Sequence, residues 1–166
     1  MRNINISSRN IKEKAYKSLV RPQLEYSATV WDPFQQGHID QIEKVQRRAA
    51  RYVTGRHRNR SSVGQMIDQL QWPSLKQRRK ESRLAMLYKI INSKVAIDQQ
   101  KYFSKPTRTS RHSQHHTLAI PSARKDSRKW SFFINTVRDW NNLPPDITSA
   151  ASLETFESQV NNHVHN

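Results

Sequence analysis

Apolar side chains recur every three or four residues along most of the chain, and this helical period limits the folds open to it. The period is clearest from Ile39 to Val53, where Gly55 follows as a residue that commonly ends a helix. Comparable stretches are bounded by prolines and by Ser or Asn residues that can cap a helix. The expected helices begin near residues 10, 39, 62, 74, 132 and 152. We therefore predict a mainly α fold of several short to medium helices.

Two regions depart from this pattern. Pro22 is expected to end or kink the first helix, and residues 24–31 fit either a continued helix or extended chain. Residues 98–128 lose the period and are rich in Ser, Thr, His, Lys and Arg, with 117–120 as the one candidate strand. We predict a basic, largely irregular loop there. The predicted division of the chain is a helical region 1–97, a linker 98–128 and a helical segment 129–166.

The supply of core-forming residues is small, and it excludes several classes of protein. Leu, Ile, Val and Phe make up about 21% of the 166 residues, close to the roughly 20% below which a highly charged chain stays disordered. The absence of cysteine excludes disulfides, Cys-ligated zinc and a thiol nucleophile. The acidic residues stand without an Asp-Asp pair, and the three glycines form no phosphate-binding loop. We therefore predict no catalytic residues, no metal site and no cofactor in this chain.

The sequence offers little for a membrane. No apolar run is long enough to cross a bilayer, and residues 1–8 lack the apolar core of a secretory signal. A helix over 74–94 would be basic on one side and apolar on the other, but polar residues such as Ser82 interrupt its apolar side. We predict an intracellular protein without a membrane partner. The basic run 44–60 also fits a nuclear localisation signal.

Positive charge is both large and unevenly placed. Lys and Arg number 29 against 13 Asp and Glu, which gives a formal net charge of +16. Seven cations and no acid lie between Lys44 and Arg60, whereas residues 139–166 hold four acids and no Lys or Arg. Such a charge attracts polyanions, and its segregation predicts a face that binds nucleic acid.

The basic helix after Ile39 is the strongest candidate for that face. Its predicted apolar stripe consists of Ile39, Ile42, Val45, Ala49 and Val53. Arg47, Arg48 and Arg51 are expected on the opposite side, where guanidinium groups can bind phosphate oxygens in pairs. The run 77–80 supplies a second patch by the same reasoning. The predicted nucleic-acid-binding residues are Arg47, Arg48, Arg51, Arg56, Arg58, Arg78, Arg79 and Lys80.

Histidines and aromatic residues each have two interpretations. His112, His115 and His116 could hold a zinc or nickel ion, but with no cysteine and no nearby carboxylate we expect a solvated loop. Tyr26 and Trp31 could stack on bases, although packing beneath a kinked helix is the commoner use. We assign to the core Tyr26, Trp31, Phe132, Phe133, Trp140 and Phe156.

Five blocks of sequence together carry a resemblance to a known family. They are LVRPQLEYSATVWDP (19–33), IEKVQRRAARYVTG (42–55), ESRLAMLYKIIN (81–92), FFINTVRDWNNLP (132–144) and SLETF (152–156). In their order and spacing, from about Tyr16 to Val160, these blocks resemble the C-terminal part of reverse transcriptases from LINE-like, non-LTR retrotransposons of the jockey kind.

This resemblance implies a division of roles along the chain. The first part would correspond to the polymerase thumb, whose helices grip the template–primer duplex, and the rest would be a C-terminal extension. Residues 21–31 would belong to the thumb helix and its proline break, and the basic helix would face nucleic acid. The family's catalytic aspartates, including those of its Phe/Tyr-x-Asp-Asp loop, lie upstream in the palm with the Mg²⁺ that they bind. No residue here corresponds to them, nor to the fingers, the endonuclease or the Cys/His knuckle of some relatives.

The resemblance therefore predicts a non-catalytic piece of an RNA-directed DNA polymerase, from a truncated element or a partial gene. It would contact RNA or an RNA–DNA duplex through phosphate groups, and its other partner would be the missing palm and fingers. Two alternatives stay open: a partly folded remnant without function, and an independent basic nucleic-acid-binding adaptor. A cooperative melt would argue against the remnant, and preference for a particular sequence or structure would favour the adaptor.

Overall fold

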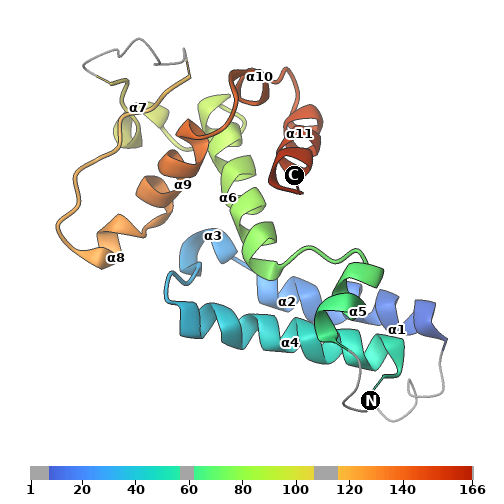
Figure 1. Ribbon diagram of the computed structural model, residues 1–166. Coiled ribbons are helices and arrows are strands. Elements are labelled where there is room, and N and C mark those ends of the chain that lie inside the picture. Colours follow the sequence, from blue (N-terminus) through green and yellow to red (C-terminus); the bar gives the residue numbers. More distant parts are fainter. Residues whose placement is uncertain (1–7, 57–61, 107–115, 166) are drawn as a thin grey trace. The chain divides into compact units, whose positions relative to one another are not determined.

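The computed structural model describes residues 8–56, 62–106 and 116–165, and these residues form helices and loops without a β-strand (Figure 1). The mainly α prediction is therefore confirmed. In chain order the elements are α1 (Arg9–Ala15), the π-helical turn η2 (Tyr16–Val20), α2 (Arg21–Glu25), α3 (Ala28–Trp31), α4 (Gln36–Thr54), α5 (Val63–Gln69), α6 (Leu75–Ile91), α7 (Gln99–Tyr102), α8 (Asp126–Lys129), α9 (Phe132–Asn141), α10 (Pro145–Thr148) and α11 (Leu153–His165).

The chain forms two compact units. The N-terminal unit comprises Met1–Ala28 and Pro33–Arg78, and the C-terminal unit comprises Thr29–Asp32 and Arg79–Asn166. The division falls within α6, and not near residues 98 and 128 where the composition changes. The reason is that Phe103 and Leu118, from the region expected to be a linker, are buried in the core of the C-terminal unit.

Pro22 does not break the first helix. Just before it the chain makes the π-helical turn η2, in which the Arg21 N–H donates to the Tyr16 carbonyl five residues back. Pro22 then lies in the first turn of α2, where its missing N–H is not needed. The helix ends at Glu25, and Ser27 turns the chain with a φ of 51°.

In the N-terminal unit α4 lies antiparallel to α1 (Figure 1), and it packs through a different face from the predicted stripe. Its buried residues are Ile39, Gln46, Ala50 and Val53, whereas Ile42, Val45 and Ala49 are half-buried. The predicted stripe was therefore wrong in part. The end of the helix agrees with the prediction, because Gly55 adopts a left-handed φ of 68°.

Gln46 accounts for the difference between the buried face of α4 and the predicted stripe. The Tyr16 hydroxyl donates to its Oε1 over 3.1 Å, and its Nε2 donates to the Pro73 carbonyl over 2.9 Å. A buried amide with both functions bonded avoids the penalty of an unsatisfied polar group. Tyr16 in turn stacks on Trp72, with ring centroids 4.5 Å apart.

Glu13 is bonded to a residue of this N-terminal core and to a neighbouring lysine. Its carboxylate accepts a hydrogen bond from Trp72 Nε1 over 3.1 Å and lies 2.7 Å from Lys17 Nζ. The hydrogen bond from Lys17 lowers the pKa of the Glu13 carboxyl. The N-terminal core thus combines apolar side chains with polar groups that satisfy one another.

In the C-terminal unit the predicted helical core is largely confirmed. Leu84, Leu87 and Tyr88 of α6 pack with Trp140 of α9 and Phe156 of α11. The Tyr88 ring stacks on Phe156 with centroids 4.6 Å apart, and its hydroxyl donates to the Ala150 carbonyl over 2.8 Å. The expected strand at 117–120 is wrong. The backbone of Leu118 is bonded instead to the side chain of Asn141. The Leu118 N–H donates to Asn141 Oδ1 over 3.0 Å, and Asn141 Nδ2 donates to the Leu118 carbonyl over 2.8 Å.

The aromatic assignments divide. Trp140 and Phe156 are buried, and Phe132 and Phe133 are partly buried against the same core. Tyr26 and Trp31, which we expected in the core, are 77% and 40% exposed. The helix continues past Pro22 and ends at Glu25, so that Tyr26 follows its last residue and Trp31 ends the separate short helix α3.

The buried phenol of Tyr16 gives a prediction about alkaline pH. Burial raises the pKa of Tyr16 from 10.0 to about 12. Below pH 10 the neutral phenol contributes its full stability, and this contribution is lost as the pH rises through about 12, because the unfolded chain ionises first. The measurement is the tyrosinate absorbance of the native chain minus that of the Tyr16→Phe variant, followed as the pH is raised. This difference should therefore increase with a midpoint near pH 12. A difference that titrates near pH 10 would show that this ring is solvated.

Candidate nucleic-acid interface

The exposed side of α4 carries a continuous group of cations, as the sequence predicts. Lys44, Arg47, Arg48 and Arg51 are all exposed, and we call these four residues the cationic face. All 13 acidic residues lie in the described part of the chain, and within it none forms an ion pair with the cationic face. These cations therefore remain available to an external anion.

The acids of α4 lie apart from its cations. Asp40 and Glu43 come before the cationic face, and Glu43 accepts a hydrogen bond from the Lys76 backbone N–H over 2.8 Å. Of the cations, Arg51 lies in the last turn of α4, where a positive charge complements the helix dipole. Gly55 then ends the helix, and Arg56 follows as a further exposed cation. Arg58 lies outside the described residues.

The second predicted patch is mostly engaged within the protein. Arg78 makes an ion pair with Glu25, with Arg78 Nη2 donating to Glu25 Oε2 over 3.0 Å. Lys80 Nζ lies 3.4 Å from Asp139. Arg79 is 0% exposed, and its Nε donates to Asp32 over 2.8 Å. We therefore remove Arg79 from the predicted binding set, because a buried guanidinium cannot reach a phosphate at the surface.

Arg79 belongs instead to a buried charge network of the C-terminal unit. Asp32 also lies 2.9 Å from Nε of Arg83, whose Nη2 donates to Asp139 over 3.0 Å. Asp32, just after α3, thus bridges the two arginines of α6, and Asp139 of α9 pairs with Arg83. Both Nη atoms of Arg79 and the Nε of Arg83 find no hydrogen-bond partner among the described residues. The two arginines are therefore paired with carboxylates but only partly satisfied by hydrogen bonds.

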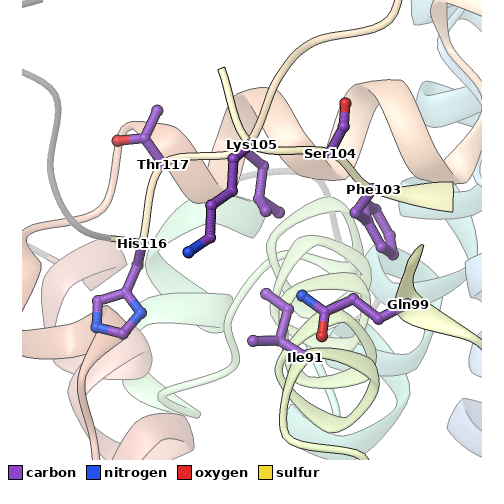
Figure 2. A pocket seen from close by; sticks show the side chains of 8 residues that line it. Ile91, Gln99, Phe103, Ser104, Lys105, His116 and Thr117 are labelled. Atoms are coloured by element: carbon purple, nitrogen blue, oxygen red, sulfur yellow. The ribbon is translucent and has the colours of Figure 1, made fainter. Parts of the chain in front are cut away.

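A hollow of about 140 Å³ lies elsewhere in the C-terminal unit. Ile91, Phe103 and Leu118 are its apolar lining residues, and Figure 2 shows the Lys105 side chain extending between His116 on one side and Gln99 on the other. The hydroxyls of Ser104 and Thr117 point away from the hollow in the same view. It therefore offers donors to a small polar or anionic group, without a hydroxyl nucleophile directed into it.

Two further sequence questions concern metals and membranes. Of the clustered histidines, His112 and His115 lie outside the described residues, and His116 borders the hollow of Figure 2. Within the described residues no group of three or more His, Asp or Glu side chains is placed to hold a metal ion. None of the helices in the same ranges has both the length and the hydropathy of a transmembrane span.

Comparison with known proteins adds no relative to this description. No protein-family model matches the chain, and neither a curated protein nor a solved structure shows significant similarity to it. The candidate site therefore rests on the geometry of the chain itself. The residue that sequence reasoning omitted is Lys44, which shares a face with Arg48 and Arg51 at helical spacing.

The charge network predicts that replacing its shared carboxylate and replacing one of its arginines will change the free energy of unfolding differently. Asp32→Asn leaves Arg79 and Arg83 without a shared carboxylate, and we expect a loss of about 3 to 5 kcal/mol in the free energy of unfolding. Arg79→Met removes a guanidinium with two unbonded nitrogens while Asp32 keeps Arg83, so we expect little change or a gain. Urea denaturation of both variants measures the difference. Equal losses would mean that Arg79, too, is a needed partner of Asp32.

Proposed function

We propose that this chain binds the phosphate backbone of RNA or of an RNA–DNA duplex through the cationic face of α4, without catalysing a reaction. The observation that carries the proposal is the set of four exposed cations on one helix, none of which forms an ion pair within the described residues. Guanidinium groups form paired, charge-assisted hydrogen bonds with phosphate oxygens. Arg56, just beyond the helix, extends the same surface.

The core beneath this face supports the proposal. The buried side of α4 is fixed by Gln46, by Ala50 and Val53 in the N-terminal core, and by Gly55 at its end. A rigid helix holds its exposed arginines at set positions, so less conformational entropy is lost when they bind a phosphate backbone. Phosphate contacts of this kind fix position without reading bases. We therefore expect binding that depends little on nucleotide sequence.

The resemblance to non-LTR reverse transcriptases supports a choice of ligand. In that family the region similar to residues 21–55 lies beside the template–primer duplex. The proposal accordingly takes the chain as a non-catalytic piece of an RNA-directed DNA polymerase, whose palm would supply the aspartates and the Mg²⁺. The palm and fingers would be its protein partners.

The salt dependence of binding tests the proposal. Replacing Arg47, Arg48 and Arg51 with Ala should lower the slope of log affinity against log salt, by about 0.9 for each lost phosphate contact on a duplex and about 0.7 on a single strand. Fluorescence anisotropy with a labelled RNA strand and with its RNA–DNA duplex measures the slope. Circular dichroism checks that the variant stays folded.

A matched control removes the same charge elsewhere. Lys94, Arg124 and Lys125 are exposed cations of the C-terminal unit, and their replacement with Ala lowers the net charge equally. This variant should keep the native slope. An equal decrease in both variants would show diffuse attraction by net charge and would contradict the proposal. A non-cooperative melt of the native chain would support the remnant instead, and preference for one RNA sequence would support the adaptor.

A further inference from the structure

An apolar groove of about 290 Å³ lies in the N-terminal unit, between the first helix and α4. Its walls are formed by Ala15, Leu19, Val20, Val45, Ala49 and Tyr52. Leu19 is 66% exposed, although its spacing from Ile11 and Ala15 predicts a buried face. The groove is therefore an apolar surface that the described residues of the unit leave uncovered.

The local structure explains why the groove is open. The side chain of Tyr16 is buried in the N-terminal core, whereas Leu19, in the same π-helical turn, remains at the surface. On α4 the buried face follows Gln46 and Ala50, so Val45 and Ala49 line the groove. The alanines at residues 15 and 49 leave room between the two helices, since each adds only a methyl group.

Two cations line the groove. Lys12 comes from α1, with its Nζ 5.1 Å from the centroid of the Tyr52 ring, and Arg48 comes from α4. Neither forms an ion pair within the described residues, while the nearby Glu13 is already bonded to Lys17 and Trp72. An occupant that complements this surface has an apolar face and carboxylates beside it.

We propose that the groove binds one amphipathic helix of a protein partner, with an apolar stripe flanked by Asp or Glu. Val45, Ala49 and Tyr52 follow one another at the spacing of a helix face, over about 10 Å at 1.5 Å per residue. This length matches the stripe i, i+4, i+7 by which a helix enters a groove. The site is distinct from the proposed nucleic-acid interface, with Arg48 as the one residue that belongs to both.

Repulsion between like charges disfavours a second copy of the chain as the occupant of the groove. Each copy carries a formal charge of +16, and a two-fold contact through the groove would set Lys12 and Arg48 of one copy near those of the other. An acidic helix instead gains from both cations, because its carboxylates can pair with Lys12 and Arg48.

A pair of synthetic peptides tests the groove directly. One is a labelled helical peptide with Leu at i, i+4 and i+7 and Glu at the flanking positions, and the other carries Lys in place of Glu. The Glu peptide should bind, measured by fluorescence anisotropy, and the Lys peptide should bind at least about tenfold more weakly. Leu19→Asn should weaken the Glu peptide about tenfold, and since Leu19 is largely exposed the variant should stay folded.

Charge reversal separates groove binding from attraction by the net charge. Lys12→Glu should weaken the Glu peptide and restore affinity for the Lys peptide, whereas Lys94→Glu, in the C-terminal unit, should leave both unchanged. Leu19→Asn should also leave the RNA affinity and its salt slope as they are. The proposal is overturned by no binding of the Glu peptide at millimolar concentration, or by equal effects of Lys12→Glu and Lys94→Glu. It is likewise overturned if Leu19→Asn weakens binding to RNA or to phosphatidylserine vesicles instead.

Discussion

The carboxylate of Asp32 holds together the buried charges of the C-terminal unit. It bridges Arg79 and Arg83, two arginines that are buried there. Residues 29–32, which include Asp32, belong to this unit, although the residues before and after them belong to the N-terminal unit. Because these two arginines are buried beside Asp32, they are not part of the cationic surface of the protein.

Both units complete a small apolar core with polar groups. The C-terminal unit uses the arginine–aspartate network, and the N-terminal unit uses Gln46 and Glu13, each bonded to residues from other segments. Such groups are tolerated inside a protein only when their partners are in place. A chain with about 21% Leu, Ile, Val and Phe reaches a folded core in this way. Four exposed cations without an ion pair among the described residues lie together on the outer side of α4.

The helices could be predicted from the sequence, whereas much of their packing could not. The extent of α4 follows from its own apolar period and from Gly55, and α9 and α11 follow in the same way. The buried face of α4 could not be predicted, because Gln46 is polar in isolation and becomes a core residue only through Tyr16 and Pro73. The irregular backbone at Leu118 was missed for a similar reason, since its hydrogen bonds come from the side chain of Asn141.

The same distinction explains the candidate site. Arg47, Arg48 and Arg51 were assigned correctly to an exposed side, because one helix fixes both its inner and its outer face. Arg78 and Arg79 have the same local sequence character, but their partners Glu25 and Asp32 lie about 50 residues away in the chain. Pairing over such separations leaves no periodic trace in a single sequence. It was the tertiary structure that separated the exposed cationic face from the arginines paired within the protein.

The position of the cations on α4 has a consequence for how a bound strand is held. They extend from the middle of the helix to its last turn, which contains Arg51, and so lie away from the free N–H groups of its amino end. A helix that binds phosphate with its amino end uses backbone N–H groups for the contacts. On the function proposed above, side chains of α4 would make every contact, and each contact would be to the backbone of the strand and not to a base. One stretch of the strand could then replace the next on this face without a change in the kind of contact.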